Sequence, residues 1–129
     1  MMDENKNRET VHFNQAESGE WLSIPEVAGL LGVRQRDVRA MLAKNELVAV
    51  RRGANNSLLI HRLQLTENDG IFSVLTALKG TYISLSDAGF SDEEKIAWIL
   101  EFNAELDAAP IAALHSGRVH SVRRAIMTA

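Results

Sequence analysis

The stretch from Ser23 to Asn45 constrains the fold of this chain more than any other, because it has the pattern of two short helices joined by a tight turn. Ser23 and Glu26 have the spacing of a capping box, in which each side chain accepts a hydrogen bond from the other residue's backbone N–H. A helix is therefore expected to begin at Ile24. Gly32 tolerates a positive φ, so it is expected to end this helix and to allow a sharp turn into a second one.

The second helix of this pair is predicted to have one apolar face and one basic face. Val38, Met41 and Leu42 recur at helical spacing and are expected to pack against the first helix. The other side carries guanidinium, ammonium and amide groups, which suit the hydrogen-bonding edges of bases in a major groove. The pattern is typical of a DNA-binding helix-turn-helix, and the alternative is a small helical bundle whose basic face only contacts solvent.

A β-hairpin is predicted directly after the two helices. Residues 47–52 and 58–60 are β-prone, and the Gly/Asn/Ser-rich residues 53–57 between them fit a turn. A hairpin in this position is a wing, whose tip is expected to reach a phosphate or the minor groove. The predicted contacts to double-stranded DNA are Ser23, Arg34, Gln35, Arg36, Arg39, Lys44, Arg51, Arg52, Asn55 and Asn56.

The charge distribution supports this prediction although the net charge of the chain is -3. Residues 34–62 carry a net charge of +5, whereas residues 1–33 carry -4, residues 63–107 carry -7 and residues 108–129 carry +3. The largest basic block therefore coincides with the second helix and the wing. A basic surface of this kind is what phosphate contact requires, and it predicts an affinity that falls steeply with salt.

The remaining sequence predicts a polar tail and a helical C-terminal domain. Residues 1–19 are interpreted as a tail with a candidate phosphorylation site at Thr10, and Trp21 and Leu22 are expected to pack against the helix that follows. The predicted domains are a winged helix-turn-helix at 20–65 and a helical domain at 66–129. The fold class is thus mainly α with a small β-hairpin wing.

Within the C-terminal part, the pattern of residues 71–78 fits either a strand or a helix. Helices are expected at 81–88, from a capping box at Ser91 to about Phe102, at 110–116 after Pro110, and finally along Val119, Val122 and Ile126. Trp98 and Phe90 lie among aliphatic residues at packing spacing, so they are expected in the core.

The composition argues against several other classes of protein. The chain has no cysteine, and His12, His61, His115 and His120 lie in no metal-ligand spacing, so neither a metal nor another cofactor is predicted. The sequence contains no glycine-rich phosphate loop and no nucleophile elbow, which argues against an enzyme. It also lacks an apolar run of the roughly 20 residues that would span a bilayer, so a cytoplasmic protein without membrane contact is expected.

Two resemblances extend the prediction. The segments GEWLSIPEVAGLLGV, LVAVRRG, GFSDEE, PIAALHSGR and VRRA resemble an actinobacterial family of small winged-helix DNA-binding proteins, related to the MerR and excisionase type, with an uncharacterised helical C-terminal domain. The resemblance implies that Gln35, Arg36, Arg39, Arg51 and Arg52 meet DNA and that the protein regulates transcription. Arg34 departs from the usual Ser or Thr helix cap. The C-terminal pattern is also similar to antitoxin domains that bind a toxin, so the alternative function is a protein-interaction module.

One recognition helix reads only a few base pairs. A homodimer on paired half-sites is therefore expected, with the C-terminal domain as its contact or as the contact for another protein.

Overall fold

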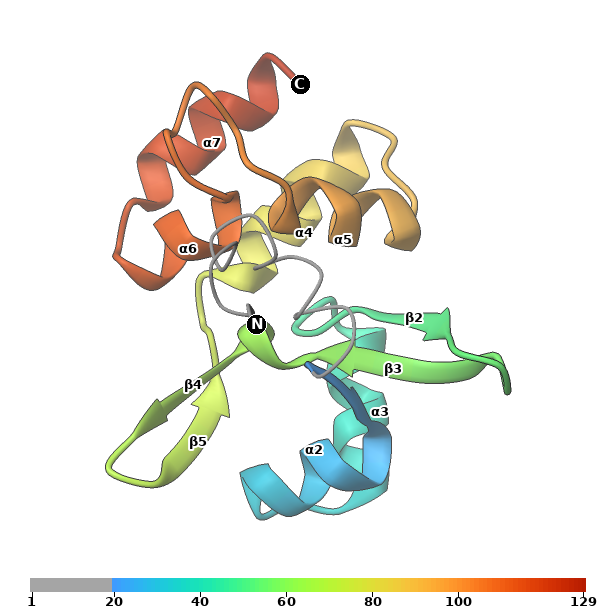
Figure 1. Cartoon of the computed structure of the whole chain (residues 1–129). Helices are drawn as coiled ribbons and strands as arrows, with labels where there is room; N and C mark the ends of the chain where they lie inside the picture. The colour runs from blue at the N-terminus through green and yellow to red at the C-terminus, as the bar shows by residue number, and fades with distance from the viewer. Residues whose placement is uncertain (1–19) are drawn as a thin grey trace, which may run out of the picture.

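The computed structural model describes residues 20–129, and it confirms the predicted fold class (Figure 1). A three-stranded sheet lies between a pair of helices on one side and a group of four helices on the other. In chain order the elements are β1 (Trp21–Ser23), α2 (Ile24–Leu31), α3 (Gln35–Ala43), β2 (Ala49–Arg52), β3 (Ser57–His61), the 3₁₀ helix η1 (Arg62–Gln64), β4 (Leu65–Asn68), β5 (Ile71–Val74), α4 (Leu78–Asp87), α5 (Asp92–Leu100), α6 (Pro110–His115) and α7 (Val119–Met127).

The helix-turn-helix forms as its sequence predicts. The Ser23 hydroxyl accepts from the Glu26 N–H at 3.1 Å, and the Glu26 carboxylate accepts from the Ser23 N–H at 2.8 Å, so α2 begins at Ile24. Gly32 ends the helix with a φ of 71°, a left-handed conformation that costs glycine little. Ala28 is buried where α2 and α3 meet, and its small side chain permits their close approach.

The wing strands belong to a sheet of order β1-β3-β2, with both pairs antiparallel. β2 pairs with β3 from Ala49 opposite Ile60 to Arg52 opposite Ser57, which confirms the predicted hairpin. Trp21 pairs with His61 on the other side of β3. This strand was not predicted. Trp21 was expected to pack against the next helix, but it packs against the C-terminal core, and only Leu22 packs against the core of α2 and α3. A three-residue strand carries too little alternation to be recognised, and its partner lies far along the chain.

A second hairpin, β4–β5, resolves the ambiguity left for residues 71–78. Ile71 to Val74 form a strand, and the helix α4 begins at Leu78, three residues before the predicted start. Asp69 and Gly70 form the turn with φ values of 53° and 80°. Phe72 and Val74 pack against the core of the helix-turn-helix, so this hairpin extends the N-terminal half of the fold.

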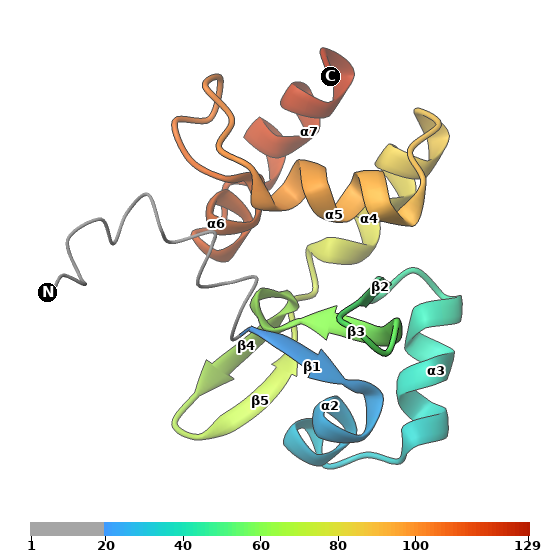
Figure 2. The ribbon, with the colours of Figure 1, turned by 45° about the vertical axis from the view of Figure 1, so that its right-hand side comes forward.

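The sheet lies between α2 and α3 on one face and α4 to α7 on the other (Figures 1 and 2), and it separates two hydrophobic cores. One core lies between the sheet and α2 and α3 and includes Val27, Val38 and Leu47. The other lies among α4 to α7 and also includes Val48 and Val50 from the β2 side of the sheet. Neighbouring side chains face opposite sides of a strand, which explains why Ala49 of β2 packs against the first core while Val50 belongs to the second. The C-terminal helices therefore cover the sheet face opposite the helix-turn-helix.

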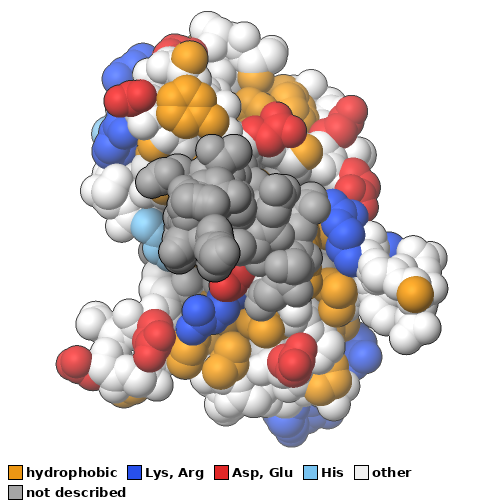
Figure 3. All heavy atoms as spheres, in the orientation of Figure 1, with side chains coloured by type: hydrophobic (Ala, Val, Ile, Leu, Met, Phe, Trp, Pro, Cys, Tyr) orange, Lys and Arg blue, Asp and Glu red, His pale blue; other side chains and the backbone are white. Residues whose placement is uncertain are grey.

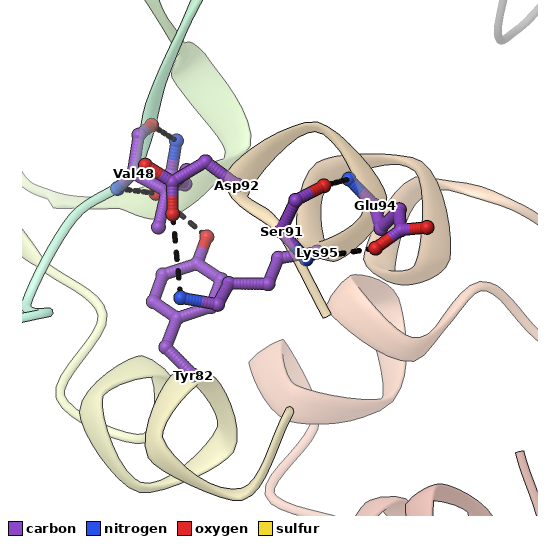
Figure 4. A network of polar contacts seen from close by, with 7 residues as sticks. Val48, Tyr82, Ser91, Asp92, Glu94 and Lys95 are labelled. Carbon is purple, nitrogen blue, oxygen red and sulfur yellow. Dashed lines mark hydrogen bonds and ion pairs between the residues drawn. The ribbon is translucent and has the colours of Figure 1, made fainter. Parts of the chain in front are cut away.

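Gln64 joins the two halves through a buried polar network. Its side-chain oxygen accepts from the Val48 N–H at 2.9 Å, and its amide nitrogen donates to the Val48 carbonyl at 2.9 Å. The Tyr82 hydroxyl on α4 donates to the same Gln64 oxygen at 2.7 Å. Figure 4 shows Tyr82 directed from α4 toward Val48. Burial, followed by the nearby charge of Asp92, raises the pKa of Tyr82 well above its ordinary value, so the phenol stays a donor.

The C-terminal helices follow the predicted caps and breaks closely. Ser91 and Glu94 form the second capping box, at the start of α5, and Gly89 before it has a φ of 93°. Lys95 is buried and its ammonium lies 3.3 Å from the Asp92 carboxylate (Figure 4). Phe90 and Trp98 are partly buried and pack against the C-terminal core, as their positions predicted.

Candidate nucleic-acid interface

The outward face of α3 carries the predicted recognition residues. Val38 is fully buried, and Met41 and Leu42 are half-buried against the same core, so the helix is oriented as the sequence predicted. The residues exposed on the other side are Gln35, Arg36, Arg39, Ala40, Ala43 and Lys44. Within residues 20–129, Arg36, Arg39 and Lys44 take part in no ion pair. This helix therefore presents hydrogen-bond donors and positive charge to the outside.

The first turn of α3 is capped from inside the helix. Arg34 occupies the N-cap position, where a guanidinium cannot accept a hydrogen bond from the helix. Instead the Asp37 carboxylate accepts from the Arg34 N–H at 3.0 Å and lies 3.5 Å from its Nε. The hydrogen bond to that backbone N–H, with a further contribution from the guanidinium, lowers the pKa of Asp37. The unusual cap thus leaves a formed helix with Arg34 exposed at its start.

A shallow hollow lies between the two helices on this side. The residues that line it are Pro25, Ala28, Gly29, Val33, Arg34, Gln35 and Arg36. Four of these residues are apolar or glycine, and two carry guanidinium groups, Arg34 at the N-cap of α3 and Arg36 in its first turn. The hollow therefore combines an apolar lining with two basic residues.

The wing lies beside α3 in both ribbon views (Figures 1 and 2). Its turn includes Gly53 with a φ of 83° and Asn56 with a φ of 54°. Arg51 is exposed, and its guanidinium donates to the Asn56 carbonyl at 3.1 Å, which holds the end of the side chain against the turn. Asn55 and Asn56 are exposed at the tip, as predicted.

Arg52 is placed differently from the predicted wing-tip contact. Its guanidinium nitrogen lies 3.0 Å from one Glu93 carboxylate oxygen and 3.2 Å from the other. The same guanidinium lies 4.9 Å above the centre of the Trp21 ring. Side chains alternate along a strand, so Arg52 faces the C-terminal helices while Arg51 faces away. The sequence therefore predicted the position of Arg52 in the wing but missed its partners.

Ser23 is also occupied within the protein, because its hydroxyl accepts the capping bond of α2. Arg62, the last basic residue of the positive block, pairs with Glu67 at 3.7 Å and lies over the Phe72 ring.

Figure 3 shows basic side chains along the lower right rim, over α2 and α3, and acidic ones over α5. The predicted contacts that the structure leaves exposed are Arg34, Gln35, Arg36, Arg39, Lys44, Arg51, Asn55 and Asn56.

Other predictions concern regions outside this surface. Thr10 lies outside the described residues. Within residues 20–129, the structure contains no group of three His, Cys, Asp or Glu side chains arranged to hold a metal ion. No helix in that range has the length and apolar character needed to cross a membrane.

Comparisons with known proteins agree with this geometry. Residues 15–57 match the family described as "DNA-binding protein Rv2175c, wHTH domain", and residues 75–128 match the "Rv2175c C-terminal domain of unknown function". The "DNA-binding protein Rv2175c" of Mycobacterium tuberculosis is 32% identical over 113 residues, which cover 78% of this chain and 74% of that protein. This chain belongs to the Rv2175c family. The predicted resemblance to an actinobacterial winged-helix family is confirmed.

A solved structure extends the Rv2175c likeness to three dimensions. The NMR structure of Rv2175c matches with a TM-score of 0.70 and 31% identity, covering 84% of this chain and 80% of the other. The match includes most of both halves, so the pairing of a winged helix-turn-helix with a C-terminal helical unit is shared. The chain therefore carries the winged helix-turn-helix of the Rv2175c family.

Proposed function

We propose that this protein binds double-stranded DNA and regulates transcription, with α3 in the major groove and the wing tip on the backbone or in the minor groove. The observation that carries the proposal is the outward face of α3, where Arg36, Arg39 and Lys44 are exposed and form no ion pair with any of residues 20–129. The name of the Mycobacterium tuberculosis relative, a DNA-binding protein, supports the same function.

The location of the exposed groups divides the proposed contacts into two kinds. Gln35, Arg36 and Arg39 lie along a helix that a major groove can accommodate, so they are assigned to base edges. Arg51 and the tip asparagines lie on a hairpin beside that helix and are assigned to phosphate or to the minor groove. DNA sequence would then be read mainly by α3.

A salt titration against random-sequence duplex DNA tests the proposal. Each phosphate neutralised by the protein releases counterions, so log K is expected to fall against log salt with a slope near -0.9 per contact. A protein that used this surface only for an apolar protein contact would show a much weaker dependence. An affinity that stays unchanged between low and physiological salt would therefore contradict DNA binding through this surface.

Three single variants separate base reading from phosphate contact. Arg36→Ala and Arg39→Ala are each expected to cost about 1 to 3 kcal/mol on the preferred sequence and much less on others, because a bidentate base contact is lost. Arg51→Ala is expected to weaken all sequences alike and to reduce the salt slope by about one contact. The measurement is fluorescence anisotropy on a duplex selected from a random pool and on a scrambled duplex. Equal losses on both duplexes for all three variants would show that α3 reads no bases.

A second candidate function is protein binding by the C-terminal helices. Ile83, Phe102 and Met127 are large apolar residues that are 42%, 61% and 84% exposed there. The proposed partner is a second copy of the chain or another protein, and two copies would place two recognition helices on paired half-sites. Sedimentation velocity with and without DNA is the test. A monomer bound one to one on a palindromic site would contradict the homodimer.

A further inference from the structure

We propose that Glu93, on the C-terminal helical domain, sets the DNA affinity of the wing by holding Arg52 away from phosphate. This inference rests on the proposed DNA binding and assigns a role in it to the helical half of the chain. Glu93 belongs to neither the helix-turn-helix nor the wing. It lies in the first turn of α5, which packs against the β2 side of the sheet.

The contacts of Arg52 make it a shared group between the two halves. One guanidinium nitrogen donates to both carboxylate oxygens of Glu93, at 3.0 and 3.2 Å, and to the Arg51 carbonyl at 2.9 Å. The guanidinium also lies 4.9 Å above the Trp21 ring. Three different groups therefore hold one charge at the last strand pair before the wing turn, and Figure 3 shows basic and acidic side chains adjoining where the wing meets α5.

The exposure of this pair makes it reversible. The Arg52 side chain is 35% exposed and that of Glu93 is 57% exposed, so water and salt screen their attraction. A DNA phosphate is an equally good acceptor for a guanidinium and can compete with the carboxylate. In the free protein Glu93 therefore neutralises one of the two wing arginines, and only Arg51 is available to DNA without the loss of an ion pair.

The surroundings of Glu93 supply a matched control. Glu94 lies next to it in the same helical turn and has the same charge, but its carboxylate accepts from the Ser91 N–H at 2.8 Å as part of the capping box. Gln in place of Glu94 keeps an oxygen that can accept this bond. Glu93→Gln and Glu94→Gln thus remove the same charge from almost the same place, and only Glu93→Gln weakens the hold on Arg52.

The test measures duplex DNA binding against salt for both variants, alone and combined with Arg52→Met. Glu93→Gln is expected to raise affinity for a random-sequence duplex by about 1.5- to 5-fold and to steepen the salt slope by about 0.9, since Arg52 becomes a phosphate contact. Glu94→Gln is expected to leave the slope unchanged. In the Arg52→Met background, whose side chain can still pack on Trp21, the two Glu variants are expected to behave alike.

Measurements without DNA keep this inference separate from the proposed function. A double-mutant cycle of Arg52→Met and Glu93→Gln on urea unfolding is expected to show coupling of up to about 5-fold in the unfolding constant. Wild-type protein that does not bind DNA would overturn the proposed function and this inference with it. Wild-type binding with identical slopes for Glu93→Gln and Glu94→Gln would overturn this inference alone.

Discussion

Gln64→Ala is expected to lower the free energy of unfolding by about 3 to 5 kcal/mol. The substitution removes three buried hydrogen bonds at once and leaves the Val48 N–H, the Val48 carbonyl and the Tyr82 hydroxyl without their partner. Each buried polar group left unsatisfied costs about 1 to 3 kcal/mol, and the missing side chain adds a small cavity. Urea unfolding followed by circular dichroism measures the change.

Tyr82→Phe is the graded comparison for Gln64→Ala. It deletes only the bond from α4 and leaves Gln64 paired to Val48, so a loss of about 1 to 1.5 kcal/mol is expected. The order of the two losses matters more than their size. If Gln64→Ala cost no more than Tyr82→Phe, the amide would not be the group that joins the sheet to the C-terminal helices.

Acidification is expected to lower the free energy of unfolding by about 3 kcal/mol, because the buried His61 ring takes up a proton less readily than in the unfolded chain. The ring is fully buried and its Nδ1 accepts from the Leu63 N–H at 3.1 Å, so the neutral ring carries its proton on Nε2. Burial lowers the pKa of His61 from 6.5 to about 4. Between these values the unfolded chain binds a proton that the folded chain does not, so stability falls as the pH drops from about 6.5 to about 4.

The matched variant for this measurement is His61→Asn. The Asn oxygen can take the place of Nδ1 in accepting from Leu63, because Asn side chains accept the same bond two residues on, and it does not titrate. Urea unfolding at pH 7 and at pH 4.5 is expected to show a smaller pH-dependent loss in His61→Asn than in wild type. His120→Asn, at an exposed histidine, is the control for general effects of the change. Equal losses in wild type and His61→Asn would contradict the role of the buried ring.

The parts of the fold that local chemistry determines could be predicted from the sequence. The capping box of Ser23 and Glu26, the left-handed Gly32 and the alternating hairpin around Gly53 each depend on residues a few positions apart. The orientation of α3 followed from Val38 and its helical neighbours. For the same reason, the exposed part of the candidate interface agreed with the predicted residues on α3 and at the wing tip.

The features that were missed depend on residues far apart in the chain. β1 forms because Trp21 pairs with His61, and Arg52 is held by Glu93, which lies 41 residues further along the chain. Gln64 has no sequence signal as a polar link, since its partners are 16 and 18 residues away. Arg52 was therefore predicted to contact DNA, although its nearest acceptor is the Glu93 carboxylate within the protein.

The division of one strand segment between two cores affects any attempt to cut the protein into its domains. Val48 and Val50 are 3% exposed because the C-terminal helices cover them. An excised fragment of residues 20–65 would place both valines and the Trp21 ring in water, and would also lose Phe72 and Val74 from its other face. Such a fragment would expose an apolar surface and would be prone to aggregation. The smallest fragment expected to fold without that exposure therefore includes the C-terminal helices.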